Sequence, residues 1–181
     1  GHEARAHAGE TALSLEQANQ LLKQAIQHYE AGEASRACPL TERLIAQFPQ
    51  QGVLWKVHGA VLTALGEREA ALQAKRRAVE LAPNDADALA NLGNSLQEAD
   101  EVDEAETVLR QALAVEPNHL NGLNNLGMVL YRLFRFKEAQ ETLEQTLALN
   151  PDFPAALINY GNVLRDQNKI DEAEAAYARV A

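Results

Sequence analysis

The chain has 181 residues, of which 46% are hydrophobic and only 5% aromatic. Its 33 alanines and 26 leucines favour helices, and this apolar content excludes a disordered chain. A net charge of −10 argues against nucleic acid binding, and no apolar run approaches the roughly 18 residues that a membrane span needs. We therefore expect an all-α protein without membrane insertion. A single cysteine, Cys38, makes a cytoplasmic location the default and leaves a periplasmic one open.

Residues 1–17 precede the regular part of the chain. Gly1 and His2 are interpreted as a cloning remnant, because the only methionine is Met128. The leader is expected to be mobile up to about Thr11. Ser14 and Gln17 then have the spacing of a capping box, which predicts that a helix starts here.

From residue 18 onward the sequence repeats every 34 residues, in blocks 18–51, 52–85, 86–119, 120–153 and an incomplete 154–181. The eighth position of each block is small and the twentieth is alanine. The thirty-second position of the four complete blocks is proline. These residues are Ala25, Gly59, Gly93, Gly127 and Gly161; Ala37, Ala71, Ala105, Ala139 and Ala173; and Pro49, Pro83, Pro117 and Pro151.

Each column of the repeat has a physical reason. Positions 4, 7, 8 and 11 lie on one side of a helix with 3.6 residues per turn, so they form its buried stripe. Small residues at positions 8 and 20 let two helices approach closely, and the proline ends the second helix. Each block is therefore predicted to be a helical hairpin that must stack on its neighbours to bury its apolar face.

This pattern resembles the tetratricopeptide repeat over residues 18–181. The resemblance implies a right-handed superhelical solenoid that binds proteins or peptides and has no cofactor. The third block carries the closest match, through Leu89, Leu92, Gly93, Leu96, Ala105, Leu109, Ala112 and Pro117.

Three residues depart from the repeat pattern. His58 and Lys75 replace apolar residues, and His58 and His28 are interpreted as partly buried packing residues. Pro39 lies inside the second helix of the first block, so that helix should start late or kink.

The second, sixth, ninth and thirteenth positions of each first helix lie opposite the buried stripe, on the side that lines the concave groove of a solenoid. Asn91, Asn125 and Asn159 occupy the sixth position of three consecutive blocks. An amide can donate to and accept from a peptide unit, so a ladder of asparagines could hold an extended peptide backbone. The alternative is that these are solvated polar residues in a recently duplicated repeat. The predicted peptide-binding groove consists of Asn91, Asn94, Asn125, Asn159, Asn162 and Arg132.

The ladder resembles the repeat region of O-GlcNAc transferases, where asparagines at the corresponding position hold the peptide substrate. That resemblance implies a substrate-binding role for Asn91, Asn125 and Asn159. Similar repeats also precede bacterial sulfotransferase domains. A carboxylate clamp, by contrast, requires Lys or Arg at the second position, where this chain has Asn19, Val53, Asp87, Asn121 and Ala155.

The positions within the repeat also define two further surface patches. The second block is apolar at its groove positions, and we expect a ligand side chain or, by slight preference, the leader to cover it. A dense acidic run crosses the hairpin turn of the third block, where helix capping or a basic partner would explain it. The apolar groove patch is Val53, Val57, Ala60 and Ala64; the acidic patch is Glu98, Asp100, Glu101, Asp103, Glu104 and Glu106.

The chain stops inside the fifth block, before any proline. We therefore expect further repeats or another domain in the full protein. The end of the solenoid should expose an apolar face that pairs with a second copy of the chain, a homo-oligomer contact. That predicted face comprises Leu157, Tyr160, Leu164, Ala173, Tyr177 and Val180.

No catalytic or metal-binding constellation is evident. The histidines (His2, His7, His28, His58 and His119) show no metal-ligand spacing, and Cys38 has no nearby histidine in sequence. The sequence thus predicts a non-catalytic, peptide-binding interaction module. The alternatives are the substrate-recruiting arm of a larger glycosyltransferase or sulfotransferase, and an assembly scaffold that uses its end or convex surfaces.

Overall fold

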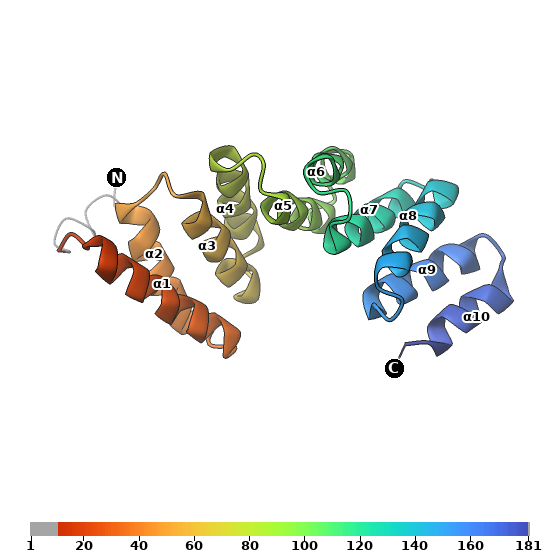
Figure 1. Ribbon diagram of the computed structural model, residues 1–181, viewed down its shortest axis with the longest axis horizontal. Coiled ribbons are helices and arrows are strands. Elements are labelled where there is room, and N and C mark those ends of the chain that lie inside the picture. Colours follow the sequence, from red (N-terminus) through yellow and green to blue (C-terminus); the bar gives the residue numbers. More distant parts are fainter. Residues whose placement is uncertain (1–10, 181) are drawn as a thin grey trace. The chain divides into compact units, whose positions relative to one another are not determined.

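The computed structural model describes residues 11–180, which form ten α-helices and no β-strand (Figure 1). The predicted all-α class is confirmed. The helices are α1 (Leu15–Glu30), α2 (Ala34–Gln47), α3 (Gly52–Ala64), α4 (Arg68–Leu81), α5 (Ala86–Glu98), α6 (Val102–Val115), α7 (Leu120–Arg132), α8 (Phe136–Leu149), α9 (Pro154–Asp166) and α10 (Ile170–Ala178).

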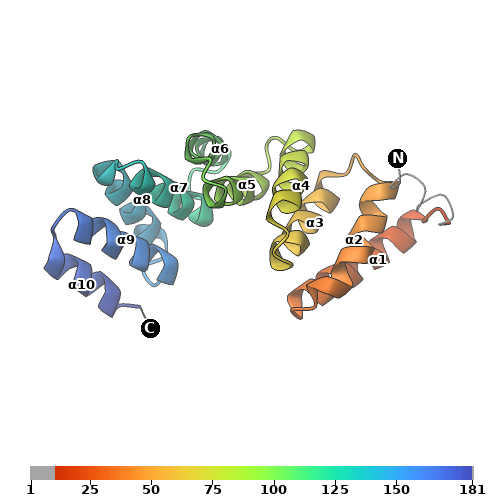
Figure 2. The same cartoon turned by 180° about the vertical axis from the view of Figure 1, so that it is seen from behind.

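The chain divides into two compact units, one ending at Pro83 and the other beginning at Asn84. The first unit contains α1 to α4, and the second contains α5 to α10. Within each unit, consecutive helices pair as hairpins and each hairpin packs against the next (Figures 1 and 2). In the second unit, the first helices of successive hairpins also contact one another, α5 with α7 and α7 with α9.

The helix boundaries follow the 34-residue period. The first helices of repeats two to five begin at Gly52, Ala86, Leu120 and Pro154, and the second helices of all five begin at the same spacing. The helices α2, α4, α6 and α8 each end two residues before a repeat proline. This is the expected effect, because a proline disfavours helical geometry in the residue that precedes it.

The first repeat is less regular than the others, as the sequence indicated. The predicted capping box is present: the Ser14 hydroxyl accepts from the Gln17 amide at 3.1 Å, and the Gln17 side chain accepts from the Ser14 amide at 2.9 Å. The predicted late start of α2 is wrong, because the helix begins in frame at Ala34 and continues through Pro39. Pro39 and Ser35 are both exposed, so water can reach the Ser35 carbonyl that the proline leaves without a partner.

The two helices of a hairpin touch at the small eighth position. A Cβ atom built on Gly93 would lie 2.5 Å from Leu109 Cγ, and one on Gly127 would lie 2.7 Å from Leu143 Cγ. Both leucines are fully buried. The glycines therefore set the distance between the helices, as the sequence predicted.

The two departures from the pattern, His58 and Lys75, are both buried. The His58 ring bonds through Nδ1 to the Thr41 hydroxyl at 2.8 Å, which satisfies a polar atom inside the hairpin stack. The aliphatic stem of Lys75 lies over Gly59, with its Cγ 3.0 Å from where a Cβ would be. Long cationic side chains bury their stems in this way, so Lys75 takes the packing role of the leucines.

The burial of His58 predicts an acid-sensitive contribution to stability. Burial lowers the pKa of His58, partly offset by the Glu42 carboxylate, so the folded protein takes up this proton less readily than the unfolded chain. The contribution is complete above the unfolded pKa of about 6.5 and is lost as the pH falls through the folded value. When the pH is lowered from about 7.5 to about 5.5, we expect the free energy of unfolding to fall less for His58→Leu than for wild type. Urea unfolding at both pH values measures this, and equal losses would contradict it.

One hairpin turn is strained. The turn residues at the fifteenth position all have positive φ, and they are Gly32, Gly66, Asp100, Phe134 and Asn168. Phe134, with φ 59° and 80% of its surface exposed, is the bulky exception.

Replacing Phe134 by asparagine, the residue used in the equivalent turn at Asn168, should therefore stabilise the fold. The left-handed conformation costs an ordinary residue about 1–2 kcal/mol, whereas asparagine tolerates it. The edge contact with Phe136, at 6.1 Å between ring centroids, is worth about 0.5 kcal/mol at so exposed a site. We expect Phe134→Asn to gain about 1 kcal/mol by thermal unfolding. A loss of stability would mean that the aromatic contact outweighs the strain.

Candidate functional site

The three ladder asparagines lie on helices that pack side by side. Asn91, Asn125 and Asn159 occupy equivalent positions on α5, α7 and α9 of the second unit. Asn91 is exposed, and Asn125 and Asn159 are half-buried. The period of the sequence therefore places one amide per repeat on the same side of this unit.

The ladder members differ in their hydrogen bonds. Among residues 11–180, the side chains of Asn91 and Asn125 have no hydrogen-bond partner. Asn159 Nδ2 donates to Oδ1 of Asn124 on the preceding first helix, at 3.0 Å. This bond joins two neighbouring repeats, and the side chain of its acceptor, Asn124, is buried. Two of the three amides thus keep their full capacity to bind a peptide, and the third keeps part of it.

The other predicted groove residues bond within the protein. Asn94 Nδ2 donates to Glu98 at 3.3 Å, and Asn162 Oδ1 accepts from the Tyr177 hydroxyl at 2.7 Å. The Arg132 guanidinium donates to the Gln97 carbonyl and to Asp100, both at 2.5 Å. Arg132 therefore joins α7 to the end of α5, and this structural role was not evident from the sequence.

Asp87, Glu116 and His119 form a cluster whose ligand atoms lie within 4.8 Å of one another. His119 Nδ1 accepts from the Gly122 amide at 2.9 Å, which caps α7, and Nε2 lies 2.5 Å from Asp87 Oδ1. Because Nδ1 accepts, the proton of the neutral ring is on Nε2 and is donated to Asp87. A metal ion would need the Nε2 lone pair, so the cluster is a capping arrangement that also joins the start of α7 to α5.

The predicted acidic patch is partly neutralised by arginines. Glu106 pairs with Arg110 at 2.9 Å and with Arg135 at 2.8 Å, and Asp100 pairs with Arg132. Arg135 also pairs with Glu138, and these carboxylates raise the pKa of the guanidinium further above its usual range. The charge left for a basic partner is therefore smaller than the count of acidic residues suggests.

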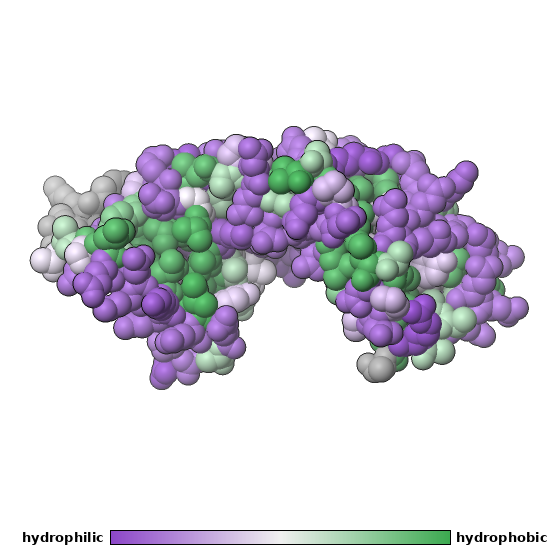
Figure 3. Space-filling model, viewed as in Figure 1, coloured by the Kyte–Doolittle hydropathy of each residue, from purple (hydrophilic) through white to green (hydrophobic). Residues whose placement is uncertain are grey.

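The apolar groove patch lies on α3 of the first unit. Val53 and Ala64 are exposed, and Val57 and Ala60 are half-buried. Figure 3 shows hydrophobic surface over this helix. Val57 packs against Ala34, Ala37 and Val61, so part of the patch belongs to the core between α2 and α3.

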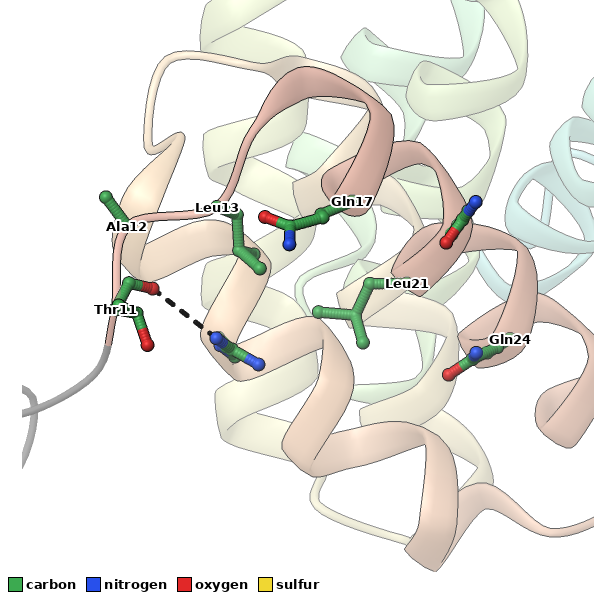
Figure 4. Close-up of a pocket in the computed structure, with 8 residues that line it drawn as sticks. Thr11, Ala12, Leu13, Gln17, Leu21 and Gln24 are labelled. Carbon is green, nitrogen blue, oxygen red and sulfur yellow. Dashed lines mark hydrogen bonds between the residues drawn. The ribbon is translucent and has the colours of Figure 1, made fainter.

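The described part of the leader follows α2 and does not cover this patch. Gln47 accepts from the Leu13 amide at 2.7 Å, and Arg43 donates to the Thr11 carbonyl at 3.4 Å. A pocket of about 400 Å³ lies beside this segment and is lined also by residues of α1 and by Arg43 of α2. Figure 4 shows the residues that line it. Residues 1–10, with His2 and His7, lie outside the described part of the chain, and so does the mobility expected there.

The expected apolar end of the chain is only partly exposed. Leu157, Leu164 and Ala173 are buried between α9, α10 and the preceding repeat. Tyr160 and Tyr177 are half-buried and bond to Glu144 at 3.0 Å and to Asn162. The large exposed apolar side chains on these two helices are instead Ile158 and Ile170. The repeat pattern in the sequence did not distinguish residues that pack within the last hairpin from residues that would pack on a following hairpin.

Cys38 does not have the environment of a nucleophile. Burial raises the pKa of the thiol to about 11, and its contact with Glu42 at 3.4 Å acts in the same direction. The thiol is therefore protonated at neutral pH, whereas nucleophilic cysteines react as thiolates.

The fold and the repeat geometry define a helical-repeat protein of the interaction-scaffold class. Three family models described as tetratricopeptide repeat match residues 84–152, 124–181 and 21–50. The chain belongs to the tetratricopeptide-repeat family. Members of this family bind protein partners and typically act as non-catalytic scaffolds. No curated protein matches the sequence.

Several solved structures share the fold. PilW, described as a widely conserved type IV pilus biogenesis factor, is 20% identical and superposes with a TM-score of 0.82 over 92% of this chain and 79% of its own. MamA of Desulfovibrio magneticus RS-1 is 16% identical with a TM-score of 0.78, over 90% and 92%. A thermophilic TPR protein of Thermus thermophilus is 23% identical with a TM-score of 0.74, over 90% and 89%. At these identities the likeness concerns the fold alone.

None of the described helices is both long enough and apolar enough to cross a membrane.

Proposed function

We propose that the second unit binds an extended peptide segment of a partner protein along its row of asparagines. The observation that carries the proposal is the pair Asn91 and Asn125 on the packed helices α5 and α7, whose amides have no hydrogen-bond partner among residues 11–180. Asn159 continues the row, and within the same residues its acceptor and one of its donor hydrogens are free.

The composition of the row supports recognition of the peptide backbone. Asparagine is a poor helix former, about half a kcal/mol less favourable than alanine at an interior position. Neither Asn91 nor Asn125 makes a side-chain hydrogen bond with the described residues that would offset this cost. Each amide can pair with the N–H and the C=O of one peptide unit, so the row would select an extended backbone and tolerate varied side chains.

Replacing Asn91 and Asn125 by alanine tests the proposal. Peptides selected from a phage-displayed random library against the wild-type protein are synthesised, and their affinities are measured by calorimetry. We expect the double variant to bind peptides of unrelated sequence at least about tenfold more weakly, since several hydrogen bonds are lost. Its thermal stability should be unchanged or slightly higher.

The matched control is the double variant Asn84→Ala and Asn118→Ala. Both residues are exposed, lie in loops of the same unit and carry the same side chain. This control should bind the peptides as wild type does. Equal affinities for the groove variant and the control would exclude the row of asparagines as the binding site.

A further inference from the structure

The first unit contains a small apolar pocket where its two repeats meet. The pocket has a volume of about 180 Å³, and its walls come from α1, from the end of α2 and from the start of α3. The large apolar side chains that line it are Leu15, Leu22, Leu44, Phe48, Val53 and Leu54. Leu15 and Val53 are exposed at its edge, and Leu44 is fully buried at its base.

Two neutral amides complete the lining. Asn19 on α1 and Gln51, the residue before α3, are the polar residues that line the pocket, and none of the lining residues is charged. The side chains of both make no hydrogen bond with any residue from 11 to 180. The pocket therefore combines apolar walls with two sets of free donors and acceptors.

In the second unit, the residues equivalent to Asn19 and Gln51 bond to each other and are not free. The residues 68 positions later than Asn19 and Gln51 are Asp87 and His119, which bond to each other at 2.5 Å. The large walls Leu44 and Leu54 correspond there to Ala112 and Gly122. The junction of the third and fourth repeats thus lacks both the two free amides and the large walls that form this pocket.

We propose that this pocket binds one aliphatic or aromatic side chain of an extended peptide from a partner protein, while Asn19 and Gln51 bond to the peptide units on either side of it. The volume fits such a group, because an apolar cavity of roughly 150 Å³ takes up benzene. The uncharged lining excludes acidic and basic side chains, whose burial without a counter-charge is costly.

None of the described leader residues from Thr11 to Leu13 lines this pocket. They are held on α2 instead, where Gln47 accepts from the Leu13 amide at 2.7 Å, and Gln47 and Arg43 both donate to the Thr11 carbonyl at 3.4 Å. A partner peptide, and not the leader, is therefore the occupant that the geometry favours. The inference rests on the proposed peptide-binding function, but it concerns a different unit and can be tested separately.

The test is an NMR titration of the full chain, labelled with ¹⁵N and with ¹³C at its methyl groups, with a nine-residue glycine–serine peptide that carries one central leucine. The methyl signals of Leu22, Leu44 and Val53 should shift. The same peptide with central alanine should bind about tenfold more weakly, and one with central aspartate should leave these signals unchanged. Equal binding of the leucine and alanine peptides would overturn the proposal.

Variants test the location of binding. Val53→Lys places a charge at the exposed edge of the pocket and should abolish the shifts, whereas Val115→Lys, at a similarly exposed valine of the second unit, should not. Asn19→Ala and Gln51→Ala should each weaken binding by about fivefold. Undiminished binding by Val53→Lys would overturn the proposal.

Two further outcomes identify a different occupant and would also overturn it. If deletion of residues 1–10 shifts the pocket signals without any peptide, the leader occupies the pocket. If dilution of the protein shifts them, a second copy does. The side-chain amide signals of Asn91 and Asn125 are followed in the same titration, so failure of the row of asparagines is seen independently of failure of the pocket.

Discussion

Gly93→Ala is expected to destabilise the protein by about 1–2 kcal/mol, although alanine is the better helix former by about 1 kcal/mol. The added Cβ would lie 2.5 Å from Cγ and 2.6 Å from Cδ2 of Leu109. Leu109 is fully buried, so its branched side chain has no free space to enter. Overpacking of this kind costs about 1–3 kcal/mol and more than cancels the gain in helix propensity.

Gly59→Ala is the matched control for this prediction. Gly59 occupies the same position of the second repeat, but its Cβ would meet Lys75 Cγ at 3.0 Å. The stem of lysine is unbranched and flexible, so a shift of a few tenths of an ångström relieves the contact. We expect a net change within about 0.5 kcal/mol, because the gain in helix propensity offsets the smaller clash.

Urea unfolding of both variants decides the question. A Gly93→Ala protein as stable as Gly59→Ala would mean that the glycines do not set the distance between the helices. The first repeat already shows the alternative solution: its eighth position is Ala25, and the residue that takes the place of Leu109 is the smaller Thr41. Both are buried, so a larger residue on one helix is matched by a smaller one on the other.

Asn159→Ala is expected to lower the stability by about 1–3 kcal/mol, whereas Asn125→Ala should leave it unchanged or raise it slightly. Asn159 donates to Oδ1 of Asn124 at 3.0 Å, and removing the donor leaves an acceptor of a buried side chain without this partner. Asn125 makes no comparable bond with the described residues. Two asparagines at equivalent positions should thus respond oppositely.

Thermal unfolding of the two single variants measures the difference. Replacing all three ladder asparagines by alanine should therefore also lower the stability, because the Asn159 substitution removes the bond to Asn124. If the two variants unfold at the same temperature, the bond between Asn124 and Asn159 contributes nothing measurable to the packing of α7 and α9.

The period of the sequence predicts the fold because it reports constraints within one repeat. The spacing of small residues and prolines places the helices and the close contact at Gly93, and the spacing of Ser14 and Gln17 places the capping box. Each of these features depends on residues in the same helix or hairpin. Pro39 does not delay the start of α2, because an exposed proline can lie in a helix when water reaches the carbonyl that lacks its partner.

Bonds between successive hairpins were not predictable in the same way. Asn124 with Asn159 and Asp87 with His119 lie 35 and 32 residues apart, and their formation depends on how one hairpin packs against the next. The one available signal was a polar residue at a position where other repeats have an apolar one. Asn124, for example, corresponds to Ala90 and Ile158.

The same limitation affects the predicted groove. Sequence position singled out Asn91, Asn125 and Asn159 as a ladder and placed Asn94, Asn162 and Arg132 in the same groove. The structure separates those that bond within the protein, such as Asn162 and Arg132, from Asn91 and Asn125, whose amides have no partner among the described residues.

The most direct test of the peptide-binding proposal follows the side-chain NH₂ signals of the asparagines by NMR during titration with a library-selected peptide. The proposal predicts that the signals of Asn91 and Asn125 shift progressively and saturate together with the affinity measured by calorimetry, while those of Asn84 and Asn118 stay fixed. Saturable binding that leaves the Asn91 and Asn125 signals unchanged would contradict the proposal and place the peptide on another surface.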